Sequence, residues 1–303
     1  MTTLDQLQIV DAHHHLWDLG RNYYPWLTDK PKRSEILGEY LGIRRTYMPD
    51  DYKRDAAGFN VIQTVHVEAE HDRAEQVKET AWLQEISAQY GFPNAIVGHV
   101  WFTDPECEEK LAAHRAFPLF RGIRSKPVTS EQPGANLRGK PGTMDDPKWR
   151  AGFALLGKHG LSFDLRVPFW HLEEAAELAR DFPDTPIALN HTGYPWDRSP
   201  EGLAAWRKSM ETLARSSNVQ VKVSELGLPD RPWTVEGNRS VVLDAIAIFG
   251  IDRCMFGSNF PVSGLFAPYA TVLRGVFEIL KERPHAELDA FFCSNARRFY
   301  RID

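Results

Sequence analysis

The sequence has little cysteine and no long apolar run. Three cysteines occur in 303 residues, at positions 107, 254 and 293, and no two have the spacing of a zinc-binding or redox pair. Neither a disulfide framework nor a thiolate metal site is therefore expected. No stretch approaches the roughly 20 apolar residues that a membrane helix needs, and the first ten residues lack the basic and apolar regions of a secretion signal. These absences predict a cytoplasmic protein with no membrane partner.

An excess of positive charge is also lacking. The net charge is -5 at pH 7, and no basic stretch is interleaved with aromatic residues. A nucleic-acid partner is therefore not expected. Hydrophobic residues make up 43% of the chain and charged residues 25%, which is typical of an ordinary globular domain. We expect a small-molecule substrate and no organic cofactor, and the sequence leaves a homo-oligomer open.

Short apolar segments alternate with longer helical patterns along the whole chain. The expected strands are 9–10, 61–69, 95–102, 120–126, 161–167, 186–191, 219–224 and 254–259, and the expected helices are 72–90, 105–115, 148–158, 173–182, 201–216, 238–249, 268–282 and 286–300. Eight strand-then-helix units in this length predict an α/β fold, a distorted (β/α)8 TIM barrel forming a single domain over residues 1–303. Two connections, 19–51 and 127–147, are long enough to be binding loops.

The most informative stretch is VDAHHHLWD at residues 10–18. It places three histidines at the end of an expected strand, and its neighbours are not those of a purification tag. Side chains alternate between the two faces of a strand, so His13 and His15 should share one face while His14 takes the other. Neutral imidazole is the commonest metal ligand and a ready acid or base. The stretch therefore indicates a functional His-x-His pair.

Polar residues also lie at the carboxyl ends of the remaining expected strands, which is the end of a barrel that carries the active site. In sequence order they are His66 and Glu68, His99 and Trp101, Arg124 and Lys126, Asp164 and Arg166, His191, Lys222 with Ser224 and Glu225, and Asn259. Charges there are costly unless they face water or one another. We expect substrate contacts from His66, Arg124, Lys222 and Trp101, and from Trp26 in the first long loop. The remaining histidines, at positions 71, 114, 159, 171 and 285, are interpreted as surface residues.

These motifs together resemble the amidohydrolase superfamily, in its lactonase-like amidohydrolase-2 branch. The matching segments are Asp11-Ala12-His13-His14-His15, Gly122-Ile123-Arg124, Leu189-Asn190-His191-Thr192-Gly193, Val221-Lys222-Val223-Ser224, Phe256-Gly257-Ser258-Asn259 and Asn295-Ala296-Arg297-Arg298-Phe299-Tyr300. The His-x-His pair alone is a weak motif. With the other segments in barrel order, the resemblance is specific and covers residues 9–302.

The resemblance implies hydrolysis of an ester or amide, and in this branch commonly of a lactone. In metal-dependent relatives, it also implies a divalent ion on the His-x-His pair and an aspartate at the end of strand 8 that binds the ion and acts as general base. In metal-free lactonase relatives, the same positions hold substrate and activate water without an ion. A metal lowers the pKa of bound water, while a carboxylate removes the water's proton. His13, His15 and His191 would be the metal ligands, a set that suits zinc.

The sequence departs from this pattern at Asn259, which stands where the family has aspartate. An amide cannot accept a proton near pH 7 and is a weaker metal ligand than a carboxylate. We therefore expect zinc to be weakly held or absent. The catalytic group is expected to comprise His191, Asn259, Glu68 and Asp164, with Glu225 as a further candidate base.

Three functions remain open at this point. The favoured one is a hydrolase that opens a small sugar-acid or dicarboxylate lactone. The second is a decarboxylase or lyase that acts on a small carboxylic acid on the same scaffold. The third is a catalytically impaired, ligand-binding barrel in which Asn259 marks a lost base.

Overall fold

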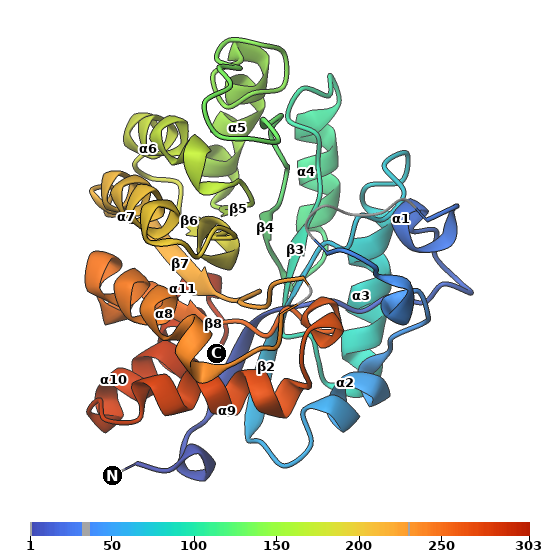
Figure 1. The fold of residues 1–303 in the computed structure, drawn as a ribbon. Coiled ribbons are helices and arrows are strands. Elements are labelled where there is room, and N and C mark those ends of the chain that lie inside the picture. Colours follow the sequence, from blue (N-terminus) through green and yellow to red (C-terminus); the bar gives the residue numbers. More distant parts are fainter. Residues whose placement is uncertain (1, 32–36, 230) are drawn as a thin grey trace.

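Eight parallel strands form the centre of the molecule (Figure 1). The computed structural model describes residues 2–31, 37–229 and 231–303. Neighbouring strands are paired in sequence order from first to last. The strands are β1 (Ile9–His14), β2 (Val61–Val67), β3 (Ala95–Gly98), β4 (Phe120–Ile123), β5 (Ser162–Leu165), β6 (Ile187–Leu189), β7 (Val219–Val223) and β8 (Cys254–Phe256). The predicted (β/α)8 barrel is confirmed.

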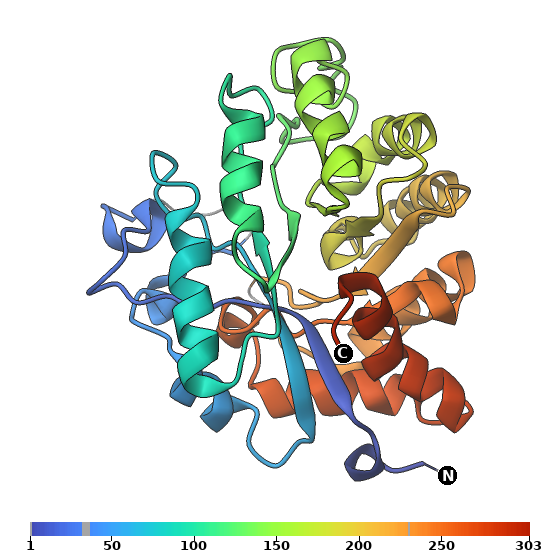
Figure 2. The same ribbon diagram turned by 180° about the vertical axis from the view of Figure 1, so that it is seen from behind.

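Helices connect the strands and surround them (Figures 1 and 2). They are α1 (Pro25–Thr28), α2 (Pro49–Asp55), α3 (Lys78–Tyr90), α4 (Cys107–Arg115), α5 (Pro147–His159), α6 (Leu172–Asp181), α7 (Pro200–Ala214), α8 (Val235–Phe249), α9 (Tyr269–Leu280), α10 (His285–Asp289) and α11 (Asn295–Tyr300). Local signals set several of the ends. The side chains of Ser199 and Thr234 cap the starts of α7 and α8, and Gly91 ends α3 in the left-handed conformation.

Most strands are shorter than the sequence pattern predicts. β3 ends at Gly98 and β8 at Phe256, although the expected strands continue through residues 102 and 259. The residues beyond each strand leave the hydrogen-bonded sheet and enter the loops at its carboxyl edge. Beyond β8, this early end lets the side chain of Asn259 turn into a cavity.

The two long connections differ in structure. The first, predicted as a loop over 19–51, contains α1 and the start of α2, and it includes residues 32–36, which lie outside the described residues. Trp17 pairs with Tyr47 across its base through two backbone hydrogen bonds of 3.0 and 2.9 Å. The second connection has no helix or strand before Pro147, as predicted.

The barrel is closed between its first and last strands by contacts outside the regular ladder. His14 and Phe260 form an isolated parallel bridge. The backbone nitrogen of Asn259 donates to the His13 carbonyl at 2.6 Å, and that of His15 donates to the Phe260 carbonyl at 2.7 Å. The His-x-His segment itself therefore joins the end of β1 to the residues after β8.

The predicted final helix over 286–300 is interrupted. A π-helical turn, η7 (Ala290–Ser294), separates α10 from α11. α11 lies beside β1 (Figure 2), and the side chain of Asn295 donates to the carbonyls of Ile251 and Cys254, each at 2.8 Å. In the described residues, no helix has the length and apolar character needed to cross a membrane.

Candidate active site

Asp11 fixes the position of the His-x-His segment. One carboxylate oxygen accepts hydrogen bonds from the backbone nitrogens of Ser258, at 2.8 Å, and His13, at 3.2 Å. The other accepts a hydrogen bond from the Tyr52 hydroxyl at 2.7 Å. Asp11 thus ties the start of the motif to the end of β8.

The three histidines of the motif separate as their spacing predicts. The rings of His13 and His15 lie 5.1 Å apart, and His13 also lies 4.5 Å from the ring of His191 after β6. His14 makes a 2.9 Å hydrogen bond with the Thr64 hydroxyl instead. The structure therefore gathers His13, His15 and His191 into one cluster.

These three imidazoles are neutral. Burial lowers the pKa of each well below the ordinary value, and nearby positive charges lower it further. His15 Nδ1 lies 2.7 Å from the Val67 carbonyl oxygen, and its Nε2 lies 3.1 Å from Oδ1 of Asn259. Both ring nitrogens of His13 are buried without a hydrogen-bond partner in the part of the protein that the structure describes. Such neutral donors have the chemistry of metal ligands, although no group of three or more His, Cys, Asp or Glu among the described residues is arranged to hold an ion.

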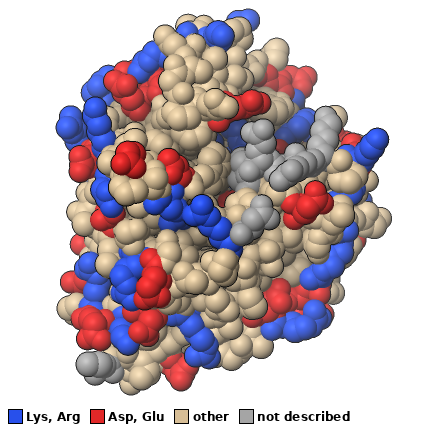
Figure 3. Space-filling view, viewed as in Figure 1, with Lys and Arg blue, Asp and Glu red and all other residues tan. Residues whose placement is uncertain are grey.

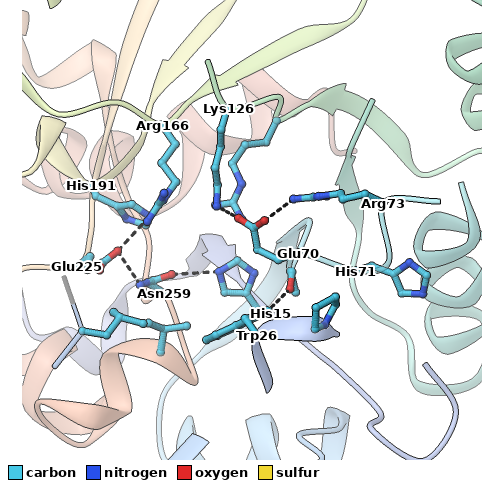
Figure 4. A pocket seen from close by; sticks show the side chains of 15 residues that line it. His15, Trp26, Glu70, His71, Arg73, Lys126, Arg166, His191, Glu225 and Asn259 are labelled. Atoms are coloured by element: carbon cyan, nitrogen blue, oxygen red, sulfur yellow. Dashed lines mark hydrogen bonds and ion pairs between the residues drawn. The ribbon is translucent and has the colours of Figure 1, made fainter. Parts of the chain in front are cut away.

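A cavity of about 410 Å³ opens beside this cluster, at the carboxyl ends of the strands (Figure 4). This volume falls within the 300–1,000 Å³ range of small-molecule sites. Its walls are formed by His15, Pro25, Trp26, Leu37, Ala69, Glu70, His71, Arg73, Arg124, Lys126, Arg166, His191, Glu225, Asn259 and Val262. Trp26 is held in the wall by a 2.8 Å hydrogen bond from its indole nitrogen to the Ala69 carbonyl.

Glu225 is the carboxylate that lies next to the histidine cluster. Its Oε2 atom lies 3.2 Å from Nε2 of His191 and accepts a 3.1 Å hydrogen bond from Nδ2 of Asn259. On the opposite ring nitrogen, His191 meets the Ser224 hydroxyl at 2.9 Å. No ion pair joins Glu225 to a lysine or arginine of the described residues. Burial raises its pKa to about 7, and the charges of Arg166, Arg124 and Lys126 oppose the rise.

Glu68, a predicted catalytic residue, is held by two arginines. Its Oε1 accepts from Nε of Arg124 at 2.7 Å, and its Oε2 accepts from Arg73 at 2.9 Å. Burial alone would raise the pKa of Glu68, but the charges of Arg73, Arg124 and Lys126 outweigh it and hold the pKa well below the usual range. Glu68 is fully buried and does not line the cavity. In this arrangement it orients Arg124 and Arg73.

Asp164 and Lys222, also predicted site residues, lie inside the barrel and away from the cavity walls. The ammonium group of Lys222 pairs with Asp164, and both side chains are fully buried. The Tyr300 hydroxyl donates to Asp164 at 2.9 Å and Asn190 donates to it at 2.9 Å. This pair therefore serves as a polar link between β5, β7 and α11, and the structure does not bring it to the cavity.

The other predicted substrate-binding residues are divided. Arg124 and Trp26 line the cavity, whereas His66 does not: it is fully buried, with Nε2 3.2 Å from the Leu16 carbonyl. Trp101 is 37% exposed and packs edge-on against His99 at 4.5 Å, outside the cavity walls.

Three histidines interpreted as surface residues are buried. His114 bonds to the Thr80 hydroxyl and the His99 carbonyl, and His171 accepts from the backbone of Ser130. His71 is buried and lines the cavity. That interpretation was wrong for these three because the burial of a histidine is decided by the neighbours that face it in the folded protein.

Sequence reasoning missed three polar residues of the cavity wall, Glu70, His71 and Arg73. It placed Lys126 and Arg166 at strand ends without giving them a role, and it named Glu225 only as a further candidate base. A shared backbone feature marks part of the site: Glu70, His191, Glu225 and Asn259 have φ of 60°, 58°, 49° and 55°. Left-handed backbone is costly for residues other than glycine and is concentrated at functional sites. No sequence pattern predicts a left-handed backbone conformation at a glutamate.

Known proteins resemble this protein over nearly all its length. The uncharacterized protein y4mH of Sinorhizobium fredii is 42% identical over 99% of this chain and all of its own. The L-fucono-1,5-lactonase of Burkholderia multivorans is 28% identical over 97% of this chain and 96% of its own. A crystal structure of an amidohydrolase from Burkholderia multivorans with bound zinc has a TM-score of 0.81 and 26% identity, covering 98% of this chain and all of that one. Because the family model Amidohydro_2, described as amidohydrolase, matches residues 10–302, the protein belongs to the amidohydrolase family.

Proposed function

We propose that this protein is a hydrolase that opens a small lactone by attack of water at the carboxyl end of the barrel. The observation that carries the proposal is the setting of Glu225. It is a cavity-lining carboxylate beside His191 and Asn259, and it forms no ion pair with a lysine or arginine of the described residues. Glu68 and Asp164 are each bound to a basic side chain and lie outside the cavity walls. The 28% identity to a lactonase supports the same reaction class.

We assign the proton transfers to Glu225. His191 and Asn259 both approach its Oε2 atom, which leaves Oε1 to accept a hydrogen bond from water in the cavity. As the water oxygen bonds to the lactone carbonyl carbon, its proton passes to Glu225. The same proton then passes to the ring oxygen as the carbon–oxygen bond breaks. The products are an alcohol and a carboxylic acid, the acid releases its proton to solvent to become a carboxylate, and Glu225 returns to its starting state.

A divalent ion is compatible with this proposal because three neutral histidines lie close together beside the cavity. His13, His15 and His191 would hold it with neutral imidazole nitrogens. When bound, such an ion polarises the carbonyl and lowers the pKa of water. Asn259 supplies an amide where a carboxylate would add negative charge, so we propose that the ion is held weakly.

The test is a panel of sugar and dicarboxylate lactones assayed by acid release. We expect Glu225→Gln to retain the fold and to lose about 10²- to 10⁴-fold in kcat, the usual contribution of a general base. Glu225→Asp keeps a carboxylate on a side chain one methylene shorter, so its loss in kcat should be smaller. Unchanged turnover in Glu225→Gln would contradict the assignment. Release of carbon dioxide from small carboxylic acids, without lactone opening, would establish the decarboxylase alternative, and binding without turnover would establish an impaired barrel.

A further inference from the structure

Arg166 is a cation of the cavity wall that has no anionic partner among the described residues. It follows β5, and its guanidinium lies over the ring of Tyr194, 5.3 Å from the ring centre. No hydrogen bond or ion pair joins Arg166 to a carboxylate anywhere in residues 2–31, 37–229 and 231–303. Its charge acts on the two groups assigned to catalysis: after burial it is the next cause of the lowered pKa of His191, and it opposes the rise that burial causes in the pKa of Glu225.

The other three cations of the wall are already paired. Arg124 binds Glu68, Arg73 binds Glu68 and Glu70, and Lys126 pairs with Glu70. In Figure 4, Arg73 and Lys126 point toward Glu70, whereas Arg166 lies beside His191 and Glu225. The outer face in Figure 3 shows basic and acidic side chains interspersed. The excess of basic over acidic side chains is therefore a feature of the cavity wall.

A half-buried guanidinium without an anionic partner favours an anionic ligand. Its planar fork matches a carboxylate, which it binds through two parallel hydrogen bonds. We infer that Arg166 binds a free carboxylate that the substrate carries beside its lactone ring. The substrate class is then the lactone of a dicarboxylic acid, in preference to a neutral sugar lactone. This inference rests on the proposed function and narrows it.

The position of Arg166 also orders the substrate. Arg166 follows β5, and the proposed base, Glu225, follows β7, with His191 of the β6 connection between them. A carboxylate on Arg166 therefore holds the lactone carbonyl toward Glu225 and His191. A neutral lactone would fill the same cavity without this second anchor.

Removing the Arg166 side-chain charge should leave the fold intact. Arg166 forms no ion pair with a carboxylate of the described residues, so Arg166→Met breaks no buried ion pair there, in contrast to the loss of Arg124. Arg138→Met is a matched control, because Arg138 pairs with Glu177 and lies outside the cavity walls. Arg166→Lys keeps the charge and removes the two-point contact.

The experiment compares D-glucaro-1,4-lactone with D-glucono-1,4-lactone, which differ in carrying a carboxylate or a hydroxymethyl group. We expect the wild type to favour the charged lactone. The ratio of the two kcat/KM values should fall about 10- to 100-fold in Arg166→Met, the range of a lost hydrogen bond to a charged group, mainly through KM. The ratio should fall less in Arg166→Lys and stay at the wild-type value in Arg138→Met. A wild type that favours the neutral lactone, or a ratio unchanged in Arg166→Met, would overturn the inference.

Binding separates this inference from the proposed reaction. Calorimetry with acyclic D-glucarate, and with uncharged D-glucitol for comparison, requires no turnover. Glucarate binding that weakens at least tenfold in Arg166→Met supports the carboxylate site even if no lactone is opened, in which case the proposed function alone fails. Equal glucarate affinity in the wild type and in Arg166→Met overturns the site.

Discussion

Replacing Arg124 by methionine should destabilise the protein, whatever it does to catalysis. Nε of Arg124 donates to Oε1 of Glu68 at 2.7 Å, and its Nη2 donates to the Glu68 backbone carbonyl. The side chains are 5% and 0% exposed. Removing one partner of a buried ion pair costs about 3–5 kcal/mol, because the remaining charge stays buried. Arg73 still neutralises the other oxygen of Glu68, so we expect a loss at the lower end, about 3 kcal/mol.

Urea denaturation at pH 7 measures this loss. A double-mutant cycle with Glu68→Gln should give a coupling energy of about 1–3 kcal/mol, since the two side chains are in direct contact. The Arg138→Met variant serves as the control, because its ion pair is exposed and worth about 0–1 kcal/mol. If the free energy of unfolding of Arg124→Met lies within about 0.5 kcal/mol of the wild-type value, the buried pair does not stabilise the fold. Arg124 would then be free to bind substrate, as its sequence position alone suggested.

Three further variants test other parts of the structure. Asn259→Asp places a second carboxylate beside Glu225. The variant should retain more zinc after dialysis, measured by elemental analysis, without a matching gain in lactone turnover. A full equivalent of zinc in the wild type, with activity abolished by chelator, would contradict weak binding. Gly257→Ala should lower activity and cost roughly 1–3 kcal/mol, because a Cβ there would lie 2.8 Å from Cβ of His13; normal activity and stability would show that the segment adjusts. Glu79→Gln should flatten the pH dependence of stability. Burial raises the pKa of Glu79 to about 8, so the folded state binds the proton more tightly, and stability falls as pH rises from about 4.3, the unfolded pKa, to about 8. Denaturation between pH 5 and 8 should show this fall in the wild type and not in the variant.

The fold was predictable because its signals are local. Parallel strands buried on both faces appear as short apolar runs, and all eight runs occur as strands. The break in the last helix was not predictable, since residues 290–294 contain neither proline nor glycine. The π turn is seen only once Phe291 and Phe292 are packed in the core.

The site was predictable only in part. The spacing of His13 and His15 places both on one face, and the barrel order brings His191 beside them. Choosing among carboxylates requires their partners, because Glu68 and Glu225 are equally plausible in the sequence. Only the structure shows Glu68 bound to Arg124 and Arg73, and Glu225 beside the histidines.

The closure between β1 and β8 has a mechanical consequence. The two strands meet through the hydrogen bonds that His13 and His15 make with residues 259 and 260, and α11 covers their other end. Any widening of this seam moves His13 and His15 away from Asn259. The backbone segments that carry these candidate site residues therefore also close the barrel, so the amplitude of motion between β1 and β8 limits how accurately their side chains are aligned. Amide exchange at residues 15 and 259 should report on both properties at once.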